Sequence, residues 1–189
     1  MLTGKAVQLC PMEPGHAGAL YAIWSHPEVA PWLEAPSLAS AEEAELLIRQ
    51  LRQLAETEDS LRWSILGPDG RVIGSCGYNY WQLPGAYRGE LGCELAPEAQ
   101  GRGYMREALG LALTFGFGTM GLNRVEAFCH PGNKRAQSLF AGLGFLPEGR
   151  LRQYRHNAAG FQDVLLYALL RGDRIPERQP AASNDAAGV

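Results

Sequence analysis

Apolar residues recur along this chain at two different periods, which predicts alternating strands and helices. Seven segments have the strand period of two or are short apolar runs: residues 5–10, 61–66, 72–81, 90–95, 124–129, 145–154 and 161–170. Helical spacing marks residues 13–25, the segment that follows residue 40, and residues 107–120 and 134–143. This order of elements predicts a mixed α/β fold (α+β), in which a single mixed sheet carries helices on both of its faces.

The helix that follows residue 40 has a strong amphipathic pattern. Ser40 and Glu43 have the spacing of a capping box, which satisfies free N–H groups at a helix N-terminus. Five apolar residues then fall on one face: Ala44, Leu47, Ile48, Leu51 and Leu54. Such a face is typical of a helix that packs against a core.

Residues 90–106 form the most informative segment, because they predict a strand, a tight glycine loop and a helix start. Leu91, Cys93 and Leu95 alternate with polar or small residues, and Pro97 cannot donate to a sheet, so the strand ends there. Gly101 and Gly103 then turn the chain into the next helix. Free N–H groups and the positive end of the dipole at a helix N-terminus favour phosphate oxygens.

Two of the three common phosphate loops do not fit this segment. The loop of nucleoside triphosphatases needs Lys and then Ser or Thr after its last glycine, but Tyr104 and Met105 follow Gly103. The dinucleotide-binding loop needs a third glycine three positions on, and position 106 is Arg106. The ligand is therefore of another kind.

The third loop does fit. Gln100-x-x-Gly103-x-Met105 resembles the Gln/Arg-x-x-Gly-x-Gly/Ala loop of the GCN5-related N-acetyltransferases (GNAT), which cradles the pyrophosphate of acetyl-coenzyme A (acetyl-CoA). Met105 departs from the small residue usual at the last position. Later segments are similar to the subgroup that acetylates ribosomal-protein N-termini: residues 121–127, Asn133, 143–145, 148–152, Asp163 and Tyr167. The resemblance covers roughly residues 5–171.

The resemblance implies a fold and a set of cofactor contacts. It implies a central, mostly antiparallel twisted sheet in which the strands that hold Glu94 and Glu126 splay apart. The pantetheine arm of acetyl-CoA would then form hydrogen bonds with the free backbone edge of the Glu94 strand. The implied acetyl-CoA contacts are Cys93, Leu95, Ala96, Gln100, Gly101, Arg102, Gly103, Tyr104, Met105 and Asn133. Asn133 also fits the role of N-cap for the helix at 134, and both roles are compatible.

The acid–base groups remain open at this stage. Glu94 and Glu90 share one face of their strand and are candidate bases, although either fits equally a salt bridge with an arginine. Phe140 and Ala136 occupy the positions where related enzymes carry a tyrosine or a serine as general acid. Trp32 and Tyr78 are the candidate substrate-contacting aromatics, with core packing as the ordinary alternative.

Composition narrows the class of protein. A chain of 189 residues suffices for one domain, expected over residues 1–175, and the aperiodic residues 176–189 are expected to form a disordered tail. The net charge of −3 argues against nucleic-acid binding, and no apolar run approaches the ~20 residues of a membrane span. The four cysteines lack metal-site spacing, so we expect no metal, free thiols and a cytoplasmic protein. Monomer and homodimer both stay open.

These patterns predict an acetyl-CoA-dependent N-acetyltransferase that acts directly on a primary amine, either the α-amino group of a protein or a small amine. Two alternatives remain. One is an acetyltransferase that detoxifies an antibiotic or polyamine. The other is a CoA-binding sensor or interaction module that has lost catalysis, which the residues at 136 and 140 would explain.

Overall fold

The computed structural model describes residues 1–33, 38–57, 60–157 and 160–173. Within them the chain forms one eight-stranded sheet with the strand order β1-β2-β3-β4-β5-β6-β8-β7. Its strands are β1 (Leu2–Thr3), β2 (Gln8–Pro11), β3 (Leu61–Leu66), β4 (Val72–Gln82), β5 (Arg88–Leu95), β6 (Arg124–Cys129), β7 (Leu146–Asn157) and β8 (Gly160–Leu170). Every neighbouring pair is antiparallel except β5 and β6, so the predicted mixed, mostly antiparallel sheet is confirmed.

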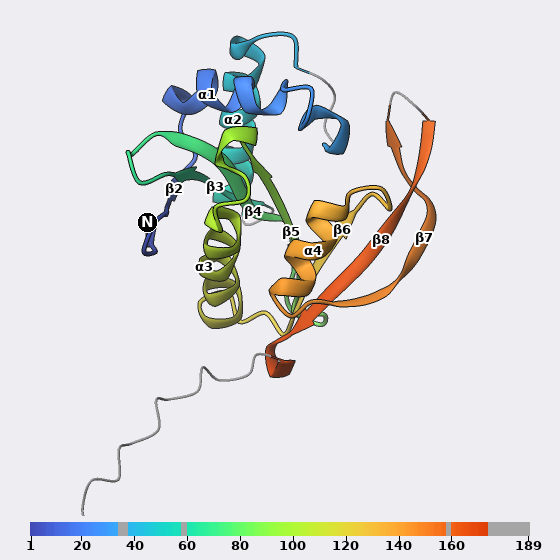
Figure 1. The fold of residues 1–189 in the computed structure, drawn as a ribbon. Helices are drawn as coiled ribbons and strands as arrows, with labels where there is room; N and C mark the ends of the chain where they lie inside the picture. The colour runs from blue at the N-terminus through green and yellow to red at the C-terminus, as the bar shows by residue number, and fades with distance from the viewer. Residues whose placement is uncertain (34–37, 58–59, 158–159, 174–189) are drawn as a thin grey trace, which may run out of the picture.

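In the described part of the chain, four α-helices cover both faces of this sheet, with α1 and α2 on one face and α3 and α4 on the other (Figure 1). Their bounds are α1 (Ala17–Trp24), α2 (Ala41–Glu56), α3 (Tyr104–Gly118) and α4 (Lys134–Gly142). Short 3-10 turns occupy Pro14–His16, Ala30–Trp32, Pro97–Ala99 and Arg171–Asp173. No helix of the described residues is long and apolar enough to cross a membrane. The predicted tail, residues 176–189, lies outside the described ranges.

Local patterns located most of these elements. The predicted strands 61–66 and 124–129 coincide with β3 and β6. The helix predicted from residue 13 begins with the 3-10 turn at Pro14–His16 and becomes α-helical only at Ala17. The strand predicted from residue 5 is β2 and starts only at Gln8, because Gly4 N–H donates to Val7 O in a turn that leads out of β1. A strand of two residues, such as β1, is too short to show a period.

The core between the sheet and α3 contains Tyr78. This residue has no exposed surface, and its hydroxyl donates to the carbonyl oxygen of Ala112 at 3.0 Å. Gly116 leaves room for the ring, since a Cβ there would lie 1.9 Å from the Tyr78 hydroxyl oxygen. The prediction that Tyr78 contacts substrate is therefore wrong: the alternation of β4 points the ring into the core beneath α3.

The middle of the sheet opens where β5 and β6 separate. The two strands pair only from Arg88 and Arg124 to Glu90 and Glu126. Beyond Glu90, β5 continues to Leu95 with β4 on one side and no described strand on the other. This confirms the predicted splay, and it leaves a stretch of backbone N–H and C=O groups free to bond a ligand.

Candidate active site

The loop between β5 and α3 is shaped for close approach of a ligand to its backbone. Gly101 and Gly103 have φ angles of +75° and +82°, a region that costs other L-residues about 1–2 kcal/mol. No atom lies within 4 Å of the position that a Cβ would take at either glycine. Gly103 is also the N-cap of α3. The loop therefore faces open space with unshielded backbone.

The first N–H groups of α3, those of Tyr104, Met105 and Arg106, have no acceptor within the helix because they belong to its first turn. Together with the helix dipole they form an anion site. The Met105 side chain is 8 % exposed and packs into the core, so the departure from a small residue leaves the backbone accessible. The chemistry of this loop fits the pyrophosphate of acetyl-CoA.

Gln100 braces the loop. Its Nε2 donates to the Leu95 carbonyl oxygen at 3.0 Å, and its Oε1 accepts from Arg135 at 2.6 Å. The side chain thus ties the loop to the end of β5 and to the first turn of α4. Gln100 holds the shape of the loop through these two bonds.

A cavity of about 950 Å³ extends from this loop to the splayed edge of β5 and the start of α4. Its walls include eight of the predicted cofactor residues: Cys93, Leu95, Gln100, Gly101, Gly103, Tyr104, Met105 and Asn133. Arg106, Lys134 and Arg135 add positive charge to the wall, which suits a polyanionic ligand. We call this space the donor cavity.

Ala96 and Arg102 do not line the donor cavity. Ala96 is 3 % exposed, and its N–H donates to the carbonyl oxygen of Ile73 at 2.9 Å. That N–H is therefore not free to bond a ligand. Arg102 is exposed.

A second cavity of about 390 Å³ lies on the side of the sheet that carries α1 and α2, and we call it the acceptor cavity. Its polar floor consists of Arg62, Asn79, Glu90, Glu94 and Arg155, which come from β3, β4, β5 and β7. Its other lining residues are mostly apolar and include Trp32, which is 45 % exposed.

Both candidate bases are held in ion pairs on this floor. Glu94 Oε2 accepts from the Arg62 guanidinium and from Ser75 Oγ, each at 2.5 Å. Glu90 Oε1 accepts from Arg155 at 3.2 Å and from Asn79 at 3.3 Å. The salt-bridge alternative is therefore realised for both carboxylates.

The network has further members that were not predicted. Arg62 also donates to Asn79, so one chain of bonds links Glu94 to Glu90. Arg155 lies over the Phe128 ring at 5.0 Å, which ties the β7–β8 hairpin to the cavity wall. One signal was available in the sequence: Arg62 is the lone charge in the apolar strand 61–66. No pattern in the sequence indicates that Arg62 pairs with Glu94.

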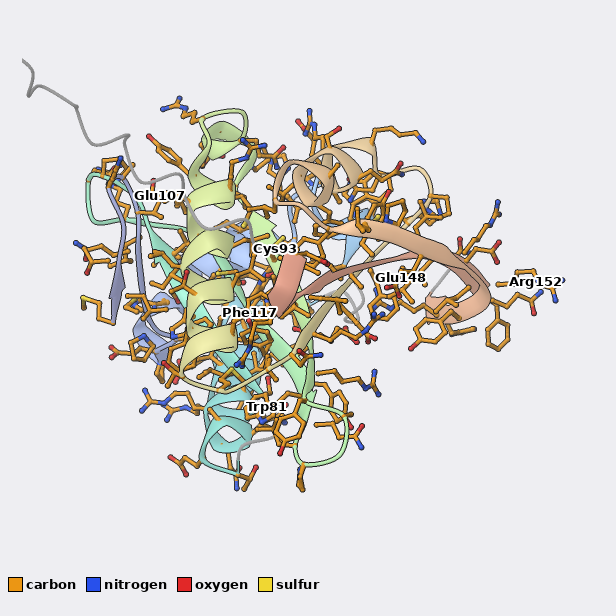
Figure 2. The ribbon with its side chains drawn as sticks, turned by 90° about the horizontal axis from the view of Figure 1, so that it is seen from below. Trp81, Cys93, Glu107, Phe117, Glu148 and Arg152 are labelled. Carbon is orange, nitrogen blue, oxygen red and sulfur yellow. The ribbon has the colours of Figure 1, made fainter. Side chains whose placement is uncertain are left out.

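The two cavities meet at five shared residues: Trp32, Cys93, Glu94, Asn133 and Ala136. In Figure 2 Cys93 lies near the middle of the molecule, between α3 and α4, whereas Arg152 of β7 projects outwards at the edge. The junction brings together groups from the 3-10 turn at Ala30–Trp32, from β5 and from the start of α4. Two ligands that enter the two cavities therefore meet at the splayed edge of β5.

The positions of the usual general acids carry no hydroxyl. Phe140 is 4 % exposed and packs with Phe145 and Tyr167, at ring-centroid distances of 5.7 Å and 5.5 Å. Ala136 is at the junction itself. Ser138 lines the donor cavity without lining the acceptor cavity. Within the described ranges, no group of three or more His, Cys, Asp or Glu is placed to hold a metal ion.

Asn133 caps α4, because its Oδ1 accepts from the Ala136 N–H at 3.0 Å. Asn133 also lines both cavities, and its contact with acetyl-CoA remains a prediction. We expect Asn133→Ser to keep the cap and to raise the KM for acetyl-CoA, because the hydroxyl caps equally well but is shorter. Asn133→Ala should in addition lose about 1 kcal/mol of stability. Thermal melts and steady-state kinetics check both variants, and an unchanged KM in both would make Asn133 a cap alone.

The junction cysteine is a poor nucleophile. Burial raises the pKa of the Cys93 thiol to about 12, with the Glu94 charge as a further cause, and burial raises the pKa of Cys129 to about 11. At pH 8 only on the order of one Cys93 thiol in 10⁴ is ionised.

Cys93→Ala should therefore change kcat by less than about tenfold, since losing a covalent nucleophile costs several orders of magnitude. Kinetics with the variant test this, and slow labelling by iodoacetamide at pH 8 is the matching expectation.

Comparison with known proteins identifies the class. The model of the family described as "Acetyltransferase (GNAT) domain" matches residues 7–146. The chain therefore belongs to the GNAT family of N-acetyltransferases, and the predicted resemblance is confirmed.

Individual relatives support the same class. An uncharacterized N-acetyltransferase, p20 of Bacillus licheniformis, is 31 % identical over 161 residues, which are 85 % of this chain and 90 % of the relative. The [ribosomal protein uS5]-alanine N-acetyltransferase of Escherichia coli K12 is 36 % identical over 88 residues, 47 % of this chain and 45 % of that protein. The structure of Mycobacterium smegmatis RimJ in complex with CoA-disulfide shares the fold, with a TM-score of 0.83 at 23 % identity over 89 % of this chain and 83 % of RimJ.

Proposed function

We propose that this acetyltransferase uses acetyl-CoA as donor and transfers the acetyl group directly to the α-amino group of a polypeptide. The observation that carries the proposal is the junction of the donor and acceptor cavities beside the free edge of β5. Holding two reactants in attack geometry contributes several kcal/mol to such a transfer, about 7–11 kcal/mol in the best cases. Ribosomal-protein acetylation by the E. coli relative supports a polypeptide acceptor.

Each part of the site has a role in this reaction. The Gly101–Gly103 backbone and the first turn of α3 bind the pyrophosphate, while Arg106 and Lys134 add charge attraction. N–H groups along the free edge of β5 bind pantetheine and polarise the thioester carbonyl. Glu94 lies at the junction and accepts the amine proton, directly or through water.

The missing general acid is tolerable on energetic grounds. The thiol of CoA should titrate like a cysteine thiol, near ~8.5, so departure as a bare thiolate at pH 7 costs on the order of 2 kcal/mol. An α-amino group has a pKa near ~7.7–8.0, so roughly a tenth to a sixth of the acceptor is already neutral at pH 7. Both steps therefore proceed with little acid–base help.

A free small amine is the second candidate acceptor. The acceptor cavity has a volume of about 390 Å³, which lies within the usual range of small-molecule pockets. A small amine therefore fits it as well as the end of a peptide does.

Calorimetry with acetyl-CoA and a thiol-release assay test the proposal together. The acceptor panel contains N-terminal peptides, lysine peptides, spermidine and an aminoglycoside, each at equal concentration. We expect binding of acetyl-CoA and the highest kcat/KM for an N-terminal peptide. Binding without turnover of any amine would favour a CoA-binding module instead, and preferred turnover of spermidine or the aminoglycoside would favour detoxification.

A further inference from the structure

The apolar face of α2 is wider than the core requires. Of its five predicted apolar residues, Ala44 and Ile48 are fully buried. Leu47 and Leu51 are only half-buried, and Leu54 is 42 % exposed. These three leucines all line the acceptor cavity. One edge of the helical stripe thus packs against the core, and the other edge forms a wall of the cavity.

The wall has the geometry of a continuous surface. Leu47, Leu51 and Leu54 follow one another at i, i+4 and i+7, so their side chains lie in a row along α2. The aromatic rings of Trp24 and Trp32 also line the cavity. An apolar ligand group that covers these leucines removes their exposed surface from water, which favours binding.

The charges of the cavity are balanced. Among the described residues that line it, the carboxylates are Glu90 and Glu94, and each is paired with an arginine, Arg155 and Arg62. An acceptor with several ammonium groups needs unpaired carboxylates, because a buried cation without a counter-charge is costly. The described floor offers such an acceptor no carboxylate that is not already in an ion pair.

We infer that the acceptor of this enzyme carries its amine next to an apolar, uncharged group that packs on the α2 wall of Leu47, Leu51 and Leu54. The inference rests on the proposed function and narrows it: the preferred polypeptide begins with a large apolar residue such as leucine or phenylalanine. The leucine wall selects this group, and the paired carboxylates disfavour a polycation.

Three peptides and three variants test this specificity. The peptides are identical except for the first residue, which is leucine, glycine or lysine, and spermidine completes the set. Leu51→Gln removes the centre of the wall, and Leu54→Gln removes an exposed part of it, so that folding is spared. Leu46→Gln is the matched control, because Leu46 is 60 % exposed on the same helix and does not line the cavity.

The unmodified enzyme should acetylate the leucine peptide with a kcat/KM about tenfold above that of the glycine peptide, a typical gain for an apolar pocket. Leu51→Gln should remove most of this preference, and Leu54→Gln part of it, through a lower kcat/KM for the leucine peptide, while both keep the affinity for acetyl-CoA, because neither residue lines the donor cavity. Leu46→Gln should match the unmodified enzyme with every substrate.

Several results would overturn the inference. A preference for the glycine peptide, the lysine peptide or spermidine would do so while leaving N-acetyl transfer intact. A leucine preference that survives in both wall variants would assign the selection to another surface. Absence of turnover with every amine, despite acetyl-CoA binding, would remove the proposed function and the inference together.

Discussion

Replacing Gly103 by aspartate is expected to abolish acetyl-CoA binding while leaving the fold largely intact. The residue has φ +82° and caps α3, so any side chain is strained there by about 1–2 kcal/mol. A carboxylate would also stand at the anion site and repel the pyrophosphate. We therefore expect an affinity loss of roughly 100-fold or more by calorimetry. Gly103→Val should lose affinity through strain and bulk without the charge, and so by less.

Gly110→Ala is the matched control for this prediction. Gly110 is in the interior of the same helix, and no atom lies within 4 Å of the position of an added Cβ. Alanine there should keep acetyl-CoA affinity and raise helix stability by up to about 1 kcal/mol. Unchanged affinity in Gly103→Asp, with a normal melting temperature, would contradict the assignment of the donor cavity.

Glu94→Gln is expected to lower kcat/KM at pH 7 by about tenfold with an α-amino acceptor, because roughly a tenth to a sixth of that amine is neutral without help. The loss should shrink as the pH rises, since more of the amine then arrives deprotonated. Recovery should be nearly complete by about pH 8.5 for an α-amino group, and it should begin only well above ~9.5 for a lysine side chain. A pH–rate profile of the variant measures this. A loss that is constant with pH would mean that Glu94 shapes the cavity only.

The same substitution also breaks an ion pair, and a second variant separates the two effects. The Arg62 and Glu94 side chains are only 9 % and 15 % exposed, so leaving Arg62 without its counter-charge should cost about 3 kcal/mol of stability. The double variant Arg62→Met, Glu94→Gln removes both charges and should recover most of that stability. If Glu94 accepts the proton, the double variant stays slow at pH 7. Restored activity together with restored stability would show that the single variant was only misfolded.

The Arg62–Glu94 pair also shows the limit of prediction from sequence. Glu94 was predicted as a base or as a salt-bridged strand residue, and its strand and face could both be assigned from a local period. Its partner could not, because Arg62 is 32 residues away and reaches it only across the intervening strand β4. Glu90 and Arg155 are separated by 65 residues and meet only because β7 and β8 extend past the cavity.

The α2 helix and Tyr78 illustrate the same division. The apolar stripe of α2 was readable from the sequence, but the sequence could not separate Ile48, which packs in the core, from Leu51, which lines the acceptor cavity. Tyr78 has the strand period of its neighbours, and only the packing of α3 against that face showed it to be core.

The sequence by itself determined the order of the elements that follow β1, the bounds of β3 and β6, and the tight glycine turn that leads into α3. Each of these depends on residues close together in the chain, where backbone preference and side-chain period act directly. The tertiary structure alone decided the pairing of the carboxylates, the position of the α2 wall along a cavity, and the junction of the two cavities. Those depend on contacts between distant strands and helices, and packing in three dimensions selects one face of each element for the core and leaves another for the ligand.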